Sequence, residues 1–231
     1  MNPTILAIDT STDACSVALL HKQQQFFQHE VMPRAHNKII MRMINQLFTA
    51  ANIQCSDLDA IAFGQGPGSF TGLRMSAGIA QGMAFGANIP VIPVSTLQLL
   101  AQTAYHKYGF MHVAVAMDAR ADEIYFNTFS LNQASCMHSS TNDKILSPQA
   151  VTLDPTVAWH SVGGGWQIYN DHFSAKTNVS LQHGTPILYP EALSLLTLAE
   201  QKQLNKEVLP ADKAYPDYIR GDDRWKKQPK V

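Results

Sequence analysis

Cysteine, charge and long apolar runs are all scarce in this sequence. Its 231 residues include only three cysteines, Cys15, Cys55 and Cys136, so neither a disulfide framework nor a CxxC zinc or redox pair is expected. Charged residues make up 15%, against about 25% in an average domain, and the net charge is −1. No strong overall field therefore draws nucleic acid or a membrane surface. No apolar run reaches the roughly 20 residues that cross a bilayer, and we expect a cytoplasmic protein with reduced thiols.

Sequence motifs of independent enzymes are missing as well. There is no H-E-x-x-H metalloprotease motif, no G-x-S-x-G serine elbow and no GxxxxGK[ST] phosphate loop. His36 stands at the start of an expected helix, but Ile40 occupies the position where a helical metal site needs its second ligand. We therefore expect no metal site, and interpret His36 as part of a solvated helix start.

Two halves with alternating strands and helices are predicted from the hydrophobic periodicity. The first half predicts strands at 4–8, 15–20, 26–31, 58–63 and 90–94, and helices at 35–51, 70–86 and 96–105. The second half predicts strands at 111–117, 123–129 and 157–162, a polar loop at 132–142, and helices at 166–173 and 191–206. The sequence therefore indicates an α/β protein with two related domains, residues 1–108 and 109–231.

A glycine block between a strand and a helix is the strongest local signal. Seven of the thirteen glycines fall within residues 64–86, which begin Gly-Gln-Gly-Pro-Gly-Ser-Phe-Thr-Gly-Leu-Arg. Such a step can bind an anion at a helix N-terminus, or it can simply make a tight turn with close packing. Gly78, Gly82 and Gly86 recur every four residues, which gives the helix a smooth face that another backbone can approach.

Carboxylates end the first strand of each half. Asp9 and Asp118 at such positions can act on a metal–phosphate complex, or they can cap the turn that follows. Gly163, Gly164 and Gly165 follow a later strand and leave room for an adenosine ring. These five residues form a candidate nucleotide site.

Several segments resemble the bacterial TsaB (YeaZ) family in order and spacing. They are Ile5–Thr12, Phe63–Arg74, Pro93–Leu97, Asp118–Arg120, Val162–Trp166 and the closing Tyr218-Ile219-Arg220…Trp225-Lys226-Lys227. The resemblance implies a two-domain fold of the actin, sugar-kinase and Hsp70 superfamily (ASKHA, RNase H-like), with mixed sheets flanked by helices. It also implies a part in forming threonylcarbamoyladenosine beside the anticodon of tRNAs that read codons starting with A.

The same resemblance implies a protein without catalysis of its own. TsaB proteins bind the catalytic paralogue TsaD, the ATPase TsaE joins them, and tRNA is met only through the complex. A homodimer is expected when TsaD is absent. TsaD-like proteins carry a histidine pair four residues apart, and Ile40 replaces the second histidine here. We therefore expect no cofactor, apart from a nucleotide at the interface of the complex.

Two helices of the first half are the expected contact surface. The residues assigned to it are Ile40, Met43, Ile44, Leu47, Arg74, Gly78 and Gly82. The alternative function is a free-standing ATP-dependent kinase or hydrolase that uses Asp9 and Asp118.

The last twelve residues, 220–231, are basic, with five Lys or Arg against two Asp. Arg220, Arg224, Lys226 and Lys227, with Trp225 among them, can contact tRNA phosphates and stack on a base. The alternative is an ordinary solvated tail.

Overall fold

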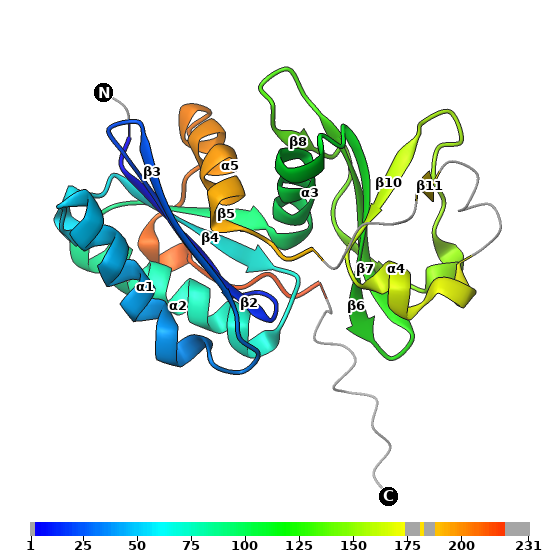
Figure 1. The fold of residues 1–231 in the computed structure, drawn as a ribbon, viewed down its shortest axis with the longest axis horizontal. Coiled ribbons are helices and arrows are strands. Elements are labelled where there is room, and N and C mark those ends of the chain that lie inside the picture. Colours follow the sequence, from blue (N-terminus) through cyan, green and yellow to red (C-terminus); the bar gives the residue numbers. More distant parts are fainter. Residues whose placement is uncertain (1–2, 174–180, 183–187, 220–231) are drawn as a thin grey trace, which may run out of the picture.

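Strand–helix alternation gives two mixed β-sheets with helices between and outside them (Figure 1). The computed structural model describes residues 3–173, 181–182 and 188–219. The strands are β1 (Ile5–Asp9), β2 (Ala14–His21), β3 (Gln24–Val31), β4 (Ala60–Gly66), β5 (Val91–Ser95), β6 (His112–Arg120), β7 (Glu123–Leu131), β8 (Met137–His138), β9 (Lys144–Leu146), β10 (Trp159–Val162) and β11 (Leu181–Gln182). The α-helices are α1 (His36–Ala51), α2 (Phe70–Ala87), α3 (Thr96–Tyr108), α4 (Gly165–Ile168) and α5 (Ala192–Leu204).

The first sheet has the order β3-β2-β1-β4-β5. β1, β2 and β3 form an antiparallel meander, whereas β4 and β5 run parallel to β1. Every residue of β1 is buried, because helices cover both faces of the sheet at this central strand. Its carboxyl end carries Asp9, next to the end of β4 and the start of α2.

Helices α1 and α2 cover one face of this sheet (Figure 1). The apolar stripe of α1 packs on the strands, with Ile40, Met43, Ile44 and Leu47 no more than 3% exposed. Assigning these four side chains to a partner surface was wrong. An amphipathic helix on a sheet turns its apolar stripe to its own core, so α1 presents polar residues and Met41 to solvent.

Helices α3 and α5 lie between the two sheets (Figure 1). Leu195, Leu196 and Ala199 of α5 pack on β1 and β4, whereas Leu100 and Ala104 of α3 pack on the second sheet. The chain therefore returns to the first sheet after residue 188. Placing the C-terminal helix in a domain of residues 109–231 was wrong, because its apolar side completes the core of the first half.

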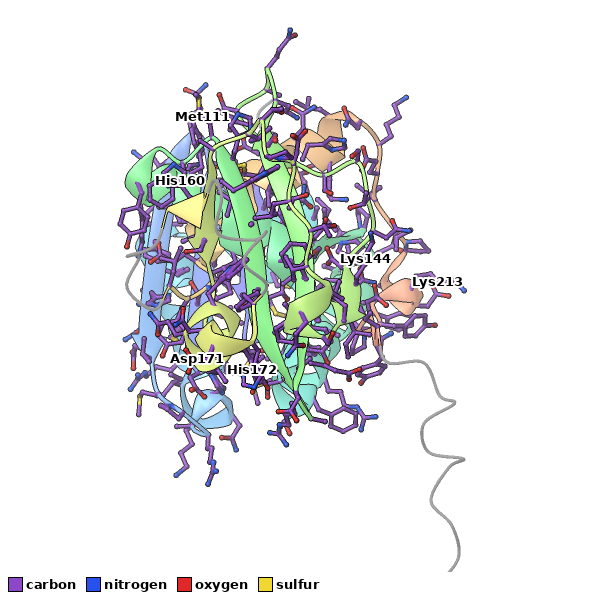
Figure 2. All side chains as sticks on the ribbon, turned by 90° about the vertical axis from the view of Figure 1, so that its right-hand side faces the viewer. Met111, Lys144, His160, Asp171, His172 and Lys213 are labelled. Carbon is purple, nitrogen blue, oxygen red and sulfur yellow. The ribbon has the colours of Figure 1, made fainter. Side chains whose placement is uncertain are left out.

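The second sheet has the order β11-β10-β6-β7-β8, with β9 also pairing with β7. Figure 2 shows Met111 and His160 at one end of this sheet and Asp171 and His172 near the other. The loop predicted at 132–142 contains the short strand β8, and β9 follows it; both were missed because two or three residues show no periodicity. Within the described residues, no helix is long and apolar enough to cross a membrane.

The position of the α1 stripe gives a stability prediction. Ile44→Ala removes a fully buried side chain and should lower the free energy of unfolding by about 2–5 kcal/mol, as large-to-small core substitutions do. Met41→Ala, at a side chain 46% exposed on the same helix, is the matched control and should change it by less than about 1 kcal/mol. Urea unfolding measures both. Equal, small effects would contradict the core assignment of Ile44.

Candidate functional site

The glycine block packs tightly against the turn that follows β1. A Cβ atom on Gly72 would overlap the carbonyl oxygen of Thr10, and one on Gly68 would overlap that of Ser11. The Thr10 hydroxyl donates to the Gly72 carbonyl at 2.7 Å, and the Ser69 amide donates to the Ser11 carbonyl at 2.7 Å. The tight-turn interpretation of these glycines is therefore confirmed.

The glycines further along α2 are not packed against another segment. No atom lies within 4 Å of the position where a Cβ of Gly78, Gly82 or Gly86 would stand. These residues are exposed and point away from the core, so the expected smooth helix face is confirmed as a surface feature. What occupies that face stays a prediction.

Asp9 is fully buried at the end of β1. Its Oδ1 accepts hydrogen bonds from the Ser11 hydroxyl (2.9 Å) and the Ser11 amide (3.2 Å), while Oδ2 has no partner. Burial raises the pKa of the carboxyl to about 7, and the two bonds from Ser11 act in the opposite, smaller direction. Because Asp9 is inaccessible and bonds to its own turn, the turn-capping interpretation describes it better than a catalytic one.

Asp118, by contrast, is exposed at the end of β6. Its Oδ1 accepts from the Arg120 amide at 2.8 Å and from the Tyr169 hydroxyl at 2.7 Å. Gly163 and Gly165 pack on the backbone of Ala116, which leaves no room for a side chain at either position. Gly164 alone of the three has open space where a Cβ would stand.

A cavity of about 1130 Å³ lies between the two halves. The β1–β2 turn and the first turns of α1 and α2 line one side; Asp118, Arg120, Gly163 and Gly164 line the other. Asp9 and Gly165 do not line it, so the five predicted nucleotide-site residues do not converge on one site. No group of three or more acidic, His or Cys side chains suited to a metal occurs among the described residues.

His36 was interpreted as a solvated helix start, and that was wrong. The first residue of α1 is only 8% exposed, and its Nε2 is buried without a hydrogen-bond partner. Asn37 and Lys38, which follow it, are exposed as expected. His36 is one of the residues that line the cavity.

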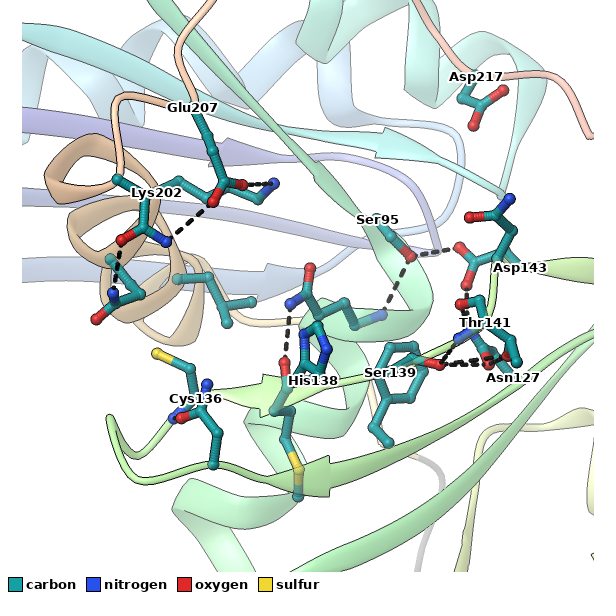
Figure 3. Close-up of a pocket in the computed structure, with 18 of the residues that line it drawn as sticks. Ser95, Asn127, Cys136, His138, Ser139, Thr141, Asp143, Lys202, Glu207 and Asp217 are labelled. Atoms are coloured by element: carbon teal, nitrogen blue, oxygen red, sulfur yellow. Dashed lines mark hydrogen bonds and ion pairs between the residues drawn. The ribbon is translucent and has the colours of Figure 1, made fainter.

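A second cavity, of about 930 Å³, was missed by the sequence interpretation (Figure 3). Asp143 lies on its wall, accepting from the Ser95 hydroxyl at 2.5 Å and from the Asn127 amide at 2.8 Å. Burial raises the pKa of Asp143, and the two hydrogen bonds partly oppose that rise. These contacts join the start of α3 to β7, so Asp143 links the two halves of the fold. A polar loop gives no sequence signal for such a role.

The basic segment 220–231 lies outside the described residues. Arg74 and Tyr218, which precede this segment in the sequence, are described. The Arg74 guanidinium stacks 3.8 Å from the Phe70 ring centre and its Nε donates to the Tyr218 hydroxyl at 3.0 Å.

The buried Asp9 carboxyl should make stability depend on pH. Its folded-state pKa lies above the ordinary 3.8, so its favourable contribution is complete below pH 3.8 and is lost as pH rises to about 7. Asp9→Asn lacks this titration. The variant should therefore gain on the parent by up to about 4 kcal/mol between pH 4 and pH 8, measured by urea unfolding across that range. A difference independent of pH would contradict the buried, unpaired carboxyl.

Comparison with known proteins gives consistent matches. A family model described as TsaD, tRNA N6-adenosine threonylcarbamoyltransferase, matches residues 18–223. The TsaB protein of Haemophilus influenzae, named as a tRNA threonylcarbamoyladenosine biosynthesis protein, is 39% identical, covering 99% of this chain and 98% of its own. The protein of that name from Escherichia coli is 37% identical, covering 97% and 98%.

Solved structures agree with these relatives. The structure of YeaZ from Pseudomonas aeruginosa superposes with a TM-score of 0.86 at 40% identity, covering 94% of this chain and 99% of that one. A second Pseudomonas aeruginosa structure, titled as similar to peptidase YEAZ, gives a TM-score of 0.88 at 40% identity. The expected ASKHA-like architecture of two mixed sheets flanked by helices is confirmed. Because the sequence identity extends over nearly the whole of both chains and the fold is the same, the chain belongs to the TsaB (YeaZ) family.

Proposed function

We propose that this chain acts in the formation of N6-threonylcarbamoyladenosine in tRNA as a non-catalytic subunit that binds TsaD. The names of its near full-length relatives support the pathway, and the match to the TsaD family model supports a relationship to the catalytic protein. TsaE joins the pair, and tRNA is contacted through the complex.

We place the surface that binds TsaD on the outward stripe of α2. Phe70, Arg74, Gly78 and Gly82 recur every four residues, and Phe85 closes the row, so all five lie on one helix face. Phe70 is 56% exposed and Phe85 is 77% exposed. Two large apolar side chains so exposed on one helix are typical of a binding surface.

The shape of this stripe suits a partner helix. Gly78 and Gly82 leave the helix backbone bare, with open space where their side chains would stand. A second helix can therefore approach the backbone closely between Phe70 and Phe85, and each ring then covers one end of the contact. Met41 on α1, which covers the same face of the first sheet, is a further exposed apolar side chain.

Binding at this face can shift the conformational equilibrium of the partner. A partner is shifted toward the state that it prefers only by the difference in binding free energy between its two states. We infer that the chain holds TsaD in its competent state. A second copy of the chain covers the same face when TsaD is absent, which gives a homodimer. We propose no cofactor for this contact, apart from a nucleotide at the interface of the complex.

Gly82→Arg tests the surface. Arginine is a better helix former than glycine by about 1 kcal/mol, and the site has room for it, so the variant should fold at least as stably as the parent. Its guanidinium fills the gap that the partner backbone needs. We expect the affinity for TsaD to fall at least about 100-fold, measured by calorimetry with purified TsaD.

Leu204→Arg is the matched control, because Leu204 is 78% exposed on α5, on the other side of the first sheet. It should leave the affinity for TsaD within about twofold. Unchanged TsaD binding by Gly82→Arg would refute the α2 surface.

The kinase or hydrolase alternative predicts ATP turnover by the isolated chain. The burial of Asp9, away from the cavity that Asp118 lines, removes the pair of carboxylates on which that reading depended. We therefore expect no phosphate release from ATP above the background of an Asp118→Asn variant. Turnover that this substitution abolishes would restore the enzyme reading.

A further inference from the structure

Arg74 is the one charged residue of the outward stripe of α2, and two contacts hold its guanidinium in place. The guanidinium lies 3.8 Å from the ring centre of Phe70, and its Nε donates to the Tyr218 hydroxyl at 3.0 Å. The Tyr218 ring packs on the Phe70 ring, with their centres 5.7 Å apart. The amide of Asp217 donates to the Gln65 carbonyl at 2.8 Å, which fixes the segment before Tyr218 on the glycine block. The guanidinium is therefore oriented before a partner arrives.

The two terminal nitrogens of this guanidinium remain available. None of the described residues accepts a hydrogen bond from Nη1 or Nη2 or forms an ion pair with Arg74, whose side chain is exposed. Such a planar pair of N–H donors matches the two oxygens of a carboxylate. Because Phe70 and Tyr218 already hold the side chain, little rotamer freedom is lost when a carboxylate binds.

A second copy of the chain offers no carboxylate from the helices of this face. Neither α1 nor α2 contains an Asp or Glu, whereas together they carry Lys38, Arg42 and Arg74. Arg42 pairs with Glu30 of β3 at 3.1 Å, so its charge is balanced within the chain. Two copies that meet through these helices therefore bring charges of the same sign together, which opposes association.

The acidic residues near α2 lie off its stripe. Asp57 and Asp212 belong to the short 3-10 turns η1 (Cys55–Asp57) and η5 (Ala211–Lys213), which pack against α2. Asp57 accepts from the Gln54 amide at 2.7 Å, and the side chain of Asp217 lines the second cavity. The stripe itself is therefore basic and lacks a negative charge.

We propose that Arg74 determines which partner this face prefers. Its guanidinium binds a carboxylate of TsaD, and a second copy, which brings only basic helices to the stripe, binds less tightly. The inference rests on the proposed function, in which TsaD and a second copy cover the same face. Tyr218 is a positioning residue, because it acts through Arg74.

Arg74→Glu tests this preference by reversing the charge. Glutamate and arginine have similar helix propensity, and the position is exposed, so the variant should fold. We expect the affinity for TsaD to fall at least about 30-fold, measured by calorimetry with purified TsaD. Self-association of the chain alone, measured by sedimentation equilibrium, should hold or tighten, because a carboxylate then meets basic helices. A destabilised variant would weaken both.

Two milder substitutions separate charge from orientation. Arg74→Gln should lower the affinity for TsaD about tenfold and make it less dependent on salt than in the parent. Tyr218→Phe keeps the ring on Phe70 but removes the hydroxyl that holds the guanidinium, so we expect a fall of about threefold with the salt dependence of the parent. Unchanged affinity in Tyr218→Phe would contradict the positioning role.

Arg42→Gln is the matched control. It removes an exposed arginine from α1, but one whose charge Glu30 already balances. The affinity for TsaD should stay within about twofold of the parent.

The inference and the proposed function fail in different ways. Equal affinity for TsaD in the parent and Arg74→Glu would overturn the inference, as would equal weakening of TsaD binding and self-association. The proposed function then still stands if Gly82→Arg weakens the binding of TsaD. A parent chain that does not bind TsaD would refute the proposed function and this inference with it.

Discussion

The contact between the glycine loop and the turn after β1 fixes the rest of the functional surface. Gly68 and Gly72 let the start of α2 lie directly on the backbone of Thr10 and Ser11, and two backbone-directed hydrogen bonds hold it there. Any side chain at Gly72 would push the helix away from the turn. The position of this one helix determines both which residues line the cavity and which residues face outward.

That close packing desolvates the Asp9 carboxyl, which is unfavourable. Its carboxyl is enclosed by the same turn and lies against Gly64, so that Oδ2 loses water without gaining a partner. A carboxyl in this position is unsuited to binding a metal–phosphate complex, because nothing in solvent reaches it. The strand-end aspartate of this chain thus stabilises the turn that follows β1.

Local patterns predicted most elements of the fold but not the direction in which they face. The periods of residues 35–51 and 70–86 predicted α1 and α2 to within a residue or two. The apolar stripe of α1 was nevertheless assigned to a partner, although Ile44 covers its own sheet. An apolar stripe only shows that something covers it, and the nearest sheet is the first candidate. The glycines of α2 were informative for the opposite reason, since a core-facing stripe would hold larger side chains.

Long-range contacts were beyond the sequence altogether. The return of α5 to the first sheet joins Leu195 to β1 across more than 180 residues, and no local pattern records that pairing. The same holds for Asp143, which sits in a polar segment and bridges Ser95 to Asn127. His36 looked solvated because the residues that follow it are polar, yet it is buried and forms part of the cavity wall. Each error placed a residue by its neighbours in the chain rather than by its neighbours in space.

The outward face of α2 helps to explain the small share of charged residues in the chain, 15%. A helix face that stays in contact with water usually carries several charged residues. Among the five residues of this stripe, only one is charged. That residue, Arg74, stacks on Phe70 and donates to Tyr218. Covering this stripe with another helix therefore removes water from two aromatic rings and from a single charge, the Arg74 guanidinium, which keeps its contacts with Phe70 and Tyr218. The desolvation that usually opposes association is small at such a surface, and this favours a protein partner over a highly charged nucleic acid at this face.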